Sequence, residues 1–270
     1  MADELTPDQL ADLLPKVVSL GRMAGKAVME VYLRGEIEAG MKQDESPITE
    51  ADLASHSVIV EGLARIASFP VLSEESAQIP YEERRSWERY WLVDPLDGTK
   101  EFIKRTDEFT VNIALIENGY PILGVVFAPA IDRMYFAARG CGAHRVSGGE
   151  NSRISVSSTV QERIRVVASR SHRGPELDAY LEKLGNHECV SMGSSLKFCL
   201  VAEGSADLYP RLGPTMEWDT AAAQAVVEEA GGKVEDLEGS RLRYNKEDLH
   251  NPWFLVFGSN AEAMKVMHLQ

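Results

Sequence analysis

The feature that most restricts the fold of this chain is the stretch TVNIALIENGYPILGVVFAP at residues 110–129. Two runs of β-forming residues flank the dipeptide Asn118-Gly119. Asn-Gly between such runs is the strongest short-range signal for a two-residue hairpin turn, because both residues tolerate a positive φ. The stretch therefore predicts a β-hairpin in the middle of the chain.

Helical patterns come before this hairpin. Thr6, Pro7 and Gln9 form a capping-box pattern, which predicts an amphipathic helix that continues to about Leu33. Thr49 is a second candidate N-cap, because apolar residues recur at helical spacing after it. The N-terminal part is thus predicted to contain two long helices.

Shorter strands adjoin the hairpin, and a mixed pattern follows it. FPVLSEES and YWLVDPLDG each predict a strand that ends in acidic residues, and RMYFAARGCGAHRV predicts a further strand pair. Beyond VSGGENS (146–152), the best candidate boundary, RIRVVASR and NPWFLVFGS predict strands, whereas SSLKFCLVAEG, DTAAAQAVVEEAGG and AEAMKVMHLQ predict helices. This order of elements indicates a layered α/β or α+β protein.

Length and charge restrict the class of protein. A chain of 270 residues can form one large domain or two of ordinary size. The formal net charge of −14 argues against a general nucleic-acid binder, because the phosphate backbone favours lysine and arginine. A small phosphorylated ligand is compatible with this charge when bound cations offset the repulsion.

The cysteines and the apolar runs bear on the compartment. Cys141, Cys189 and Cys199 show no CxxC spacing, so we expect neither a disulfide framework nor a zinc site. The start, MADELTPDQL, is polar and acidic, unlike a signal peptide, and no apolar run is long enough to span a bilayer. We therefore expect a cytoplasmic protein, with peripheral membrane association through a partner left open.

Acidic residues stand at three separate points of the chain. Glu74 and Glu75 follow a predicted strand, Asp94 and Asp97 lie in the segment VDPLDGT, and Asp219 lies in EWDTAA. Each has an ordinary explanation: solvated loop acids, turn residues and a helix N-cap, respectively. Their joint occurrence favours a different interpretation, in which the carboxylates meet around a cation.

The segment VDPLDGT is suited to a metal site. Pro95 restricts the backbone and Gly98 frees it, so the turn can direct Asp94, the Leu96 carbonyl and Asp97 at one point. Hard Mg²⁺ prefers such oxygen ligands. The EF-hand, Walker A, dinucleotide and HExxH patterns are absent, and the SxxK match at Ser194 lacks its companion motifs.

The three acidic segments, SEES, DPLDGT and WDTAA, resemble in kind and order the motifs of the inositol monophosphatase superfamily, which contains Mg²⁺-dependent, lithium-sensitive phosphatases. The resemblance covers nearly the whole chain. DGTKEF and GSSLKFCLVAEGSADLYPR are similar to its 3′(2′),5′-bisphosphate nucleotidase branch, whereas inositol phosphatases usually have DGTTNF. The resemblance implies an αβαβα sandwich of the inositol monophosphatase and fructose-1,6-bisphosphatase type, with an α+β half at 1–148 and an α/β half at 149–270.

The resemblance also implies roles for individual residues. Two or three Mg²⁺ ions would be bound by Glu74, Asp94, Leu96 (through its carbonyl), Asp97 and Asp219. Glu75 would support these ligands, and the catalytic residues would be Asp52, Glu74 and Thr99. Substrate would be bound by Gly98, Thr99, His172, Ser194, Lys197, Arg211 and Asp219. The ordinary alternatives for the second half are a surface histidine, an N-cap serine and two solvated cations.

The activity implied is Mg²⁺-dependent removal of the 3′-phosphate of adenosine 3′,5′-bisphosphate, with 3′-phosphoadenosine 5′-phosphosulfate as a second candidate substrate. The alternatives are an inositol monophosphatase or sugar bisphosphatase, and a regulatory phosphate-binding protein without catalysis. Lys100 of DGTKEF favours the nucleotide. The expected partner is a small-molecule bisphosphate, with no nucleic-acid polymer and no transmembrane segment, in a monomer or homodimer.

Overall fold

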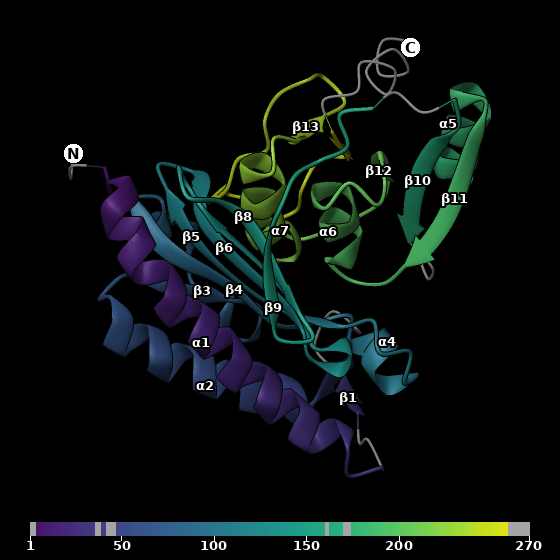
Figure 1. The fold of residues 1–270 in the computed structure, drawn as a ribbon. Helices are drawn as coiled ribbons and strands as arrows, with labels where there is room; N and C mark the ends of the chain where they lie inside the picture. Colours follow the sequence, from purple (N-terminus) through teal and green to yellow (C-terminus); the bar gives the residue numbers. More distant parts are fainter. Residues whose placement is uncertain (1–3, 36–38, 42–46, 160–161, 170–173, 259–270) are drawn as a thin grey trace.

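The computed structural model describes residues 4–35, 39–41, 47–159, 162–169 and 174–258 (Figure 1). The α-helices are α1 (Pro7–Tyr32), α2 (Glu50–Ile66), α3 (Tyr81–Arg84), α4 (Thr99–Ile103), α5 (Pro175–Leu184), α6 (Leu196–Ala202) and α7 (Glu217–Glu229). Two single turns of 3₁₀ helix are η1 (Glu74–Ser76) and η2 (Pro129–Ile131).

Two large sheets organise the chain. The seven-stranded sheet has the order β3 (Val71–Ser73), β4 (Arg89–Asp97), β5 (Thr110–Glu117), β6 (Tyr120–Ala128), β7 (Arg133–Ala138), β8 (Gly142–Ser147) and β9 (Glu150–Ile154). The five-stranded sheet has the order β11 (His187–Met192), β10 (Ile164–Ser169), β12 (Leu208–Arg211), β14 (Phe254–Phe257) and β13 (Lys233–Asp236). A separate small hairpin pairs β1 (Ala39–Met41) with β2 (Pro47–Thr49).

Helices and sheets alternate in five layers (Figure 1). Helices α1 and α2 cover one face of the seven-stranded sheet, and α7 covers the other together with α6. The five-stranded sheet packs on α6 and α7, and α5 lies on its outer face. One hydrophobic cluster fills each of the two outer interfaces, and a third fills the space between the sheets. The predicted αβαβα order is confirmed.

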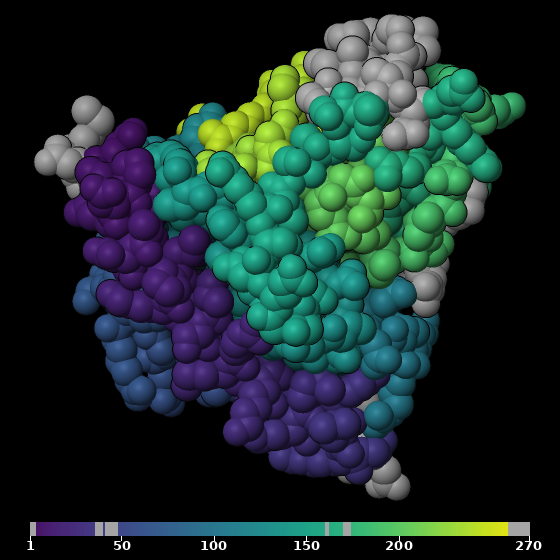
Figure 2. Space-filling view, viewed as in Figure 1, coloured from purple at the N-terminus to yellow at the C-terminus, as the bar shows by residue number. Residues whose placement is uncertain are grey.

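The local sequence signals form as predicted. Asn118 and Gly119 both have positive φ, 54° and 82°, in the two-residue turn of the β5–β6 hairpin. Thr6 caps α1 with Gln9 in a reciprocal capping box, and Thr49 caps α2 with Asp52 in the same way. In the space-filling view, the middle of the chain (teal) lies between α1 (purple) and the green part that follows it in the sequence (Figure 2).

The seven-stranded sheet extends further than the sequence predicts, both in β4 and beyond β8. β4 extends through Pro95 to Asp97, where a turn was expected, because a β-bulge accommodates the proline. The segment VSGGENS forms the β8–β9 hairpin, so the seven-stranded sheet continues past residue 148 to Ile154, and the division of the chain into two domains stays a prediction. The predicted terminal helix lies outside the described residues.

Within the described part of the chain, no helix is both long enough and apolar enough to cross a membrane. All three cysteines are in described segments, and all three are free thiols.

Candidate active site

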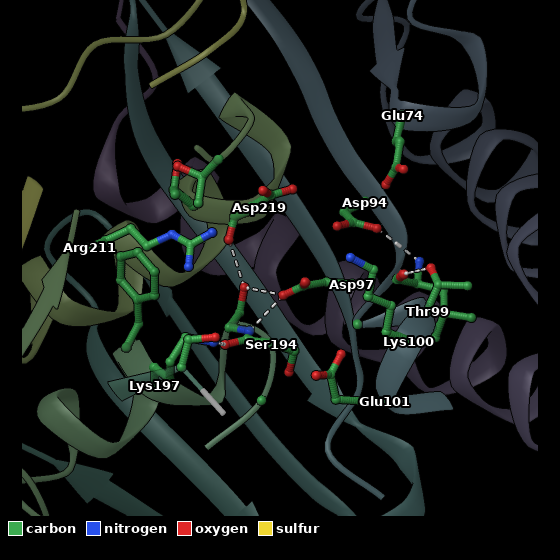
Figure 3. A pocket seen from close by; sticks show the side chains of 18 of the residues that line it. Glu74, Asp94, Asp97, Thr99, Lys100, Glu101, Ser194, Lys197, Arg211 and Asp219 are labelled. Carbon is green, nitrogen blue, oxygen red and sulfur yellow. Dashed lines mark hydrogen bonds between the residues drawn. The ribbon is translucent and has the colours of Figure 1, made fainter. Parts of the chain in front are cut away.

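A cavity of about 260 Å³ opens between the end of β4 and the helices α6 and α7 (Figure 3). Elements far apart in the sequence contribute to its wall. Acidic side chains from β4, η1 and α7 form one side, which we call the acidic side: Glu74, Asp94, Asp97 and Asp219. Lys197 of α6 and Arg211 of β12 line the opposite wall, which we call the cationic side.

The β-bulge in β4 presents the first two acids. Asp94 pairs with Asn112 of β5, and Asp97 pairs with Thr110, so β4 carries one residue more than β5 in this interval. The Ser55 hydroxyl of α2 donates to the Pro95 carbonyl at 2.7 Å, which fixes the bulge against the helix layer. The bulge therefore directs the carboxylates out of the ladder and into the cavity.

Gly98 turns the chain from β4 into α4. Its φ of +92° lies in the left-handed region that favours glycine. A Cβ atom at this position would also lie 3.2 Å from the Glu108 carbonyl oxygen and 3.3 Å from Ser194 Cβ. Gly98 thus allows the turn to approach the segment before α6.

The carboxylates of the acidic side repel one another in a buried setting. Burial raises the pKa of Asp94 well above its ordinary value, and the charges of Glu74, Asp97 and Asp219 raise it further. Burial likewise raises the pKa of Asp219, with Asp97 and Glu74 adding to the effect. A cation placed among these groups would remove both the repulsion and the unfavourable burial of charge.

The donor set fits a hard divalent cation, although the side chains are not gathered at one point. Among the described residues, no group of three or more His, Cys, Asp or Glu side chains is placed to hold a metal ion. Nevertheless, the four acids and Leu96 all line one cavity, and the donors are carboxylate and carbonyl oxygens, as Mg²⁺ prefers. The fit thus rests on the chemistry and charge of the donors, not on a preformed cage.

Thr99 and Asp52 form a pair beside the metal-binding candidates. Thr99 Oγ1 lies 3.4 Å from Asp52 Oδ1 and 3.3 Å from the Leu96 carbonyl oxygen. The other oxygen of Asp52 accepts hydrogen bonds from the Thr49 backbone and hydroxyl, at 2.8 and 2.6 Å. Asp52 therefore completes the cap of α2 and contacts Thr99 with its second oxygen, although it does not line the cavity itself.

Asp219 stands in the first turn of α7. The expectation that it is the N-cap residue is wrong by three positions, since Met216 is the N-cap and Asp219 is at N3. Its Oδ2 accepts the Met216 backbone N–H at 2.9 Å. The Asp219 carboxylate thus satisfies a backbone donor at the start of α7, and it also lines the cavity (Figure 3).

The cationic side is buried, so its charges are not solvated surface cations. Lys197 is 6% exposed and Arg211 is 8% exposed. Lys197 Nζ donates to the Ser194 carbonyl at 2.5 Å, and Arg211 donates to the Pro214 carbonyl at 2.5 Å. Burial lowers the pKa of Lys197 to about 8, against the opposing effect of the Asp97 charge. The Oγ of Ser194 is buried without a hydrogen-bond partner among the described residues.

The structure brings most of the predicted site residues into this one cavity: Glu74, Asp94, Leu96, Asp97, Gly98, Thr99, Ser194, Lys197, Arg211 and Asp219. His172 lies outside the described residues. Ser194 is not a helix cap, because α6 begins after Ser195 and neither serine caps it with its side chain. The chemical role of each of these residues stays a prediction.

Sequence reasoning missed Ser195 and Asn112. Ser195 donates to Asp97 Oδ2 through its backbone N–H at 2.6 Å, and its hydroxyl lies 2.9 Å from the same oxygen. Asn112 Nδ2 donates to the Ser195 hydroxyl at 2.9 Å. The segment GSSLK signalled a serine, but spacing alone could not indicate which of the two faces the acids.

Comparison with known proteins defines the class of protein. The Inositol monophosphatase family matches residues 9–264. The chain therefore belongs to the inositol monophosphatase family.

The similar proteins include two that are named CysQ and one that is named an IMPase. The chain is 53% identical over 247 residues to the 3′(2′),5′-bisphosphate nucleotidase CysQ of Salmonella typhimurium. The aligned region covers 90% of this chain and 99% of that protein. It is 42% identical to a crystal structure of CysQ from Bacteroides thetaiotaomicron, with a TM-score of 0.83 over 93% of this chain and 98% of the other. The structure of a Thermotoga maritima IMPase is 26% identical, with a TM-score of 0.78 over 95% and 96% of the two chains.

Proposed function

We propose that this protein is a Mg²⁺-dependent phosphatase that hydrolyses the 3′-phosphate of adenosine 3′,5′-bisphosphate to give AMP and phosphate. The observation that carries the proposal is a single cavity that is lined by five carboxylates, Glu101 and the four of the acidic side, and by the two buried cations of the cationic side. The high identity to the Salmonella CysQ nucleotidase, over nearly that protein's full length, supports the choice of substrate. 3′-Phosphoadenosine 5′-phosphosulfate is a second candidate substrate.

The acidic side would hold two or three ions through Glu74, Asp94, Asp97, Asp219 and the Leu96 carbonyl. When bound, Mg²⁺ lowers the pKa of water and neutralises negative charge on a phosphoryl group. Thr99 would orient the attacking water, and the contacts of its hydroxyl with the Leu96 carbonyl and Asp52 support this role. The buried Asp52 carboxylate would accept a hydrogen bond from this hydroxyl.

The cationic side would bind the nucleotide. Lys197 and Arg211 offer positive charge to a second phosphate, and the unpartnered Ser194 hydroxyl offers a hydrogen bond. Gly98 and the first turn of α7 would allow close approach of the scissile phosphate, because backbone N–H groups at a helix start favour anions. We include His172 in this set from the sequence resemblance.

A substrate panel tests the proposal. Purified protein is given adenosine 3′,5′-bisphosphate, its 5′-phosphosulfate relative, inositol 1-phosphate and fructose 1,6-bisphosphate, and phosphate release is measured with and without Mg²⁺ and Li⁺. We expect the nucleotide bisphosphate to be hydrolysed with the highest kcat/KM, only with Mg²⁺, and to be inhibited by Li⁺. A higher kcat/KM for inositol 1-phosphate or fructose 1,6-bisphosphate would contradict the nucleotide proposal and support an inositol monophosphatase or a sugar bisphosphatase instead.

The same panel addresses the regulatory alternative. A phosphate-binding protein without catalysis would bind the bisphosphate in a calorimetric titration but release no phosphate at any Mg²⁺ concentration. We further propose that the enzyme acts in the cytoplasm as a monomer or homodimer on this small molecule alone. Sedimentation at working concentration distinguishes the two oligomeric states.

A further inference from the structure

Two consecutive serines before α6 make different contacts. The Ser194 hydroxyl is buried in the cavity wall and makes no hydrogen bond to the described residues. The Ser195 hydroxyl, in contrast, lies 2.9 Å from Asp97 Oδ2 and 2.7 Å from the Asp219 backbone carbonyl oxygen. The first serine is therefore available to a ligand, whereas the second is engaged with the acidic side.

One oxygen of Asp97 is surrounded by donors of the protein. Ser195 contributes its backbone N–H at 2.6 Å and its hydroxyl at 2.9 Å. The Thr110 hydroxyl and the Asn112 amide approach the same Oδ2 more distantly, at 3.4 and 3.5 Å. All four contacts use Oδ2 and none uses Oδ1. A carboxylate held in this way is fixed in rotation, with its other oxygen left for a further ligand.

The Ser195 hydroxyl contacts three elements, β5, β4 and α7. It accepts a hydrogen bond from Asn112 of β5, it faces Asp97 of β4, and it faces the carbonyl of Asp219 in α7. A hydroxyl has one hydrogen to donate, so the two acceptors share it. The hydroxyl therefore lies between the Asp97 carboxylate and the Asp219 backbone carbonyl and links the two.

The backbone before Ser195 holds this geometry. Gly193 N–H donates to Glu108 Oε2 at 2.8 Å, and a Cβ on Gly193 would lie 2.7 Å from the Glu108 carbonyl oxygen. Ser194 follows with a φ of +45°, in the left-handed region. This turn is what directs the backbone N–H and the side chain of Ser195 toward Asp97. Ser195 itself is 1% exposed.

We propose that Ser195 is a positioning residue for the metal site: its hydroxyl orients the Asp97 carboxylate and fixes it relative to the first turn of α7. Ser195 acts through Asp97 and does not contact substrate. The proposal rests on the proposed metal role of Asp97. It adds to the acidic side a supporting residue from the second half of the chain, Ser195, which lies directly before α6.

The role predicts a particular pattern of losses. Substitution Ser195→Ala keeps the backbone hydrogen bond but removes the hydroxyl, so Asp97 gains rotational freedom. We expect the Kd of the metal-free protein for Mg²⁺ to rise about tenfold, as is usual when a partner of a metal ligand is lost. The KM for the nucleotide bisphosphate should change by less than about twofold, and the fall in kcat at low Mg²⁺ should be recovered by raising Mg²⁺.

The experiment titrates Mg²⁺ alone into metal-free protein by calorimetry, without substrate, and measures kcat and KM at two Mg²⁺ concentrations. Four proteins are compared with the wild type: Ser195→Ala, Ser195→Cys, Ser194→Ala and Ser205→Ala. Ser205 is exposed and bonds only to Glu203 among the described residues, so it is the matched control. Ser194→Ala should show the opposite pattern, with a higher KM and unchanged Mg²⁺ affinity.

The outcomes separate this inference from the proposed function. A wild type that neither binds Mg²⁺ nor releases phosphate overturns both. A wild type that does both, with Ser195→Ala within twofold of it in Mg²⁺ affinity, overturns the role of Ser195 alone. If Ser195→Ala does not fold, the nearly isosteric Ser195→Cys, a weaker donor, decides by the same criterion. Weaker Mg²⁺ binding in the folded variant, with KM unchanged, supports the proposal.

Discussion

The acidic side of the cavity is built mainly from neighbouring strand ends, to which α7 adds Asp219, whereas the cationic side is assembled from a helix and a strand of the second sheet. Glu74 follows β3 and Asp94 lies in β4, which pairs with β3 in parallel. Lys197 and Arg211 come from α6 and β12. Burial acts in opposite directions on the two sides: it raises the pKa of the aspartates and lowers that of Lys197. Each side is therefore unfavourable without a ligand of the opposite charge.

The largest effect is expected on the acidic side. In Asp94→Asn, we expect kcat/KM to fall by about 10³-fold or more, because one of the carboxylates that would hold Mg²⁺ is lost. The same change should raise the free energy of unfolding of the metal-free protein by about 1 kcal/mol, since it removes a buried charge among like charges. Phosphate release and denaturant unfolding in a chelator measure the two quantities.

The control for this variant is Asp12→Asn, at an exposed position of α1. It should leave activity unchanged. If Asp94→Asn kept more than about a tenth of the wild-type activity, the acidic side would not be the metal site, and the comparison between the two sides would lose its basis.

A smaller effect is expected on the cationic side. Lys197→Met keeps the aliphatic length but removes the charge, so the KM for the nucleotide bisphosphate should rise about 30-fold, as expected for a charge-assisted hydrogen bond to phosphate. The Mg²⁺ affinity should not fall, because Lys197 donates to the Ser194 carbonyl and its positive charge, which acts on Asp97, opposes a cation there. Steady-state kinetics with Lys183→Met, an exposed lysine of α5, as the control test this. An equal loss of Mg²⁺ affinity would contradict the division into two sides.

The acidic side could be predicted from the sequence because its signals are local. The strand β4 is a buried run that ends in DPLDG. A helix capped by Thr49 comes before it in the sequence, and the hairpin turn Asn118-Gly119 comes after it. Each of these signals acts over a few residues, so together they determine most of the backbone around Asp94 and Asp97. The β5–β6 hairpin and the two long helices formed at the predicted positions for the same reason. The extension of β4 through Pro95 was missed, because a bulge depends on how the partner strand is paired.

The cationic side could be predicted only in part, because its geometry depends on contacts between distant segments. Sequence alone could not place Ser195 against Asp97, since that contact needs the positive φ of Ser194 and the close approach of Gly193 to Glu108. On the acidic side, the exception to this local predictability is Asp219, whose place in its helix was missed by one turn because Met216 carries no side-chain signal for an N-cap. Burial of Lys197 likewise became evident only from the packing around α6.

The pH dependence should distinguish the two sides. Lys197 has a pKa of about 8 in the folded protein against an ordinary 10.5, so kcat/KM should fall about tenfold per pH unit above pH 8 as its charge is lost. In that window the unfolded chain binds the additional proton, so the contribution of Lys197 to the free energy of unfolding rises with pH. The acids behave oppositely: their raised pKa makes the metal-free fold less stable as pH rises above about 4.

A pH profile at saturating Mg²⁺, from about pH 6.5 to 9.5, measures the first effect. Lys197→Arg is the matched variant, because arginine keeps its charge throughout this range and should flatten the upper limb. An unchanged fall in Lys197→Arg would assign the titration to another group. The loss of stability that the acids cause as pH rises is measured by thermal unfolding of the metal-free protein at several pH values. Added Mg²⁺ should abolish this loss.

The smallest effect is expected at the rim, where Lys100 lies in the first turn of α4. Its side chain lines the cavity but is exposed, so its charge is screened by solvent. In Lys100→Thr, we expect the KM for the nucleotide bisphosphate to rise only about threefold, and no new activity on inositol 1-phosphate to appear. The same panel of substrates measures both. A gain of inositol phosphatase activity would mean that the rim, and not the buried pair Lys197 and Arg211, determines the substrate.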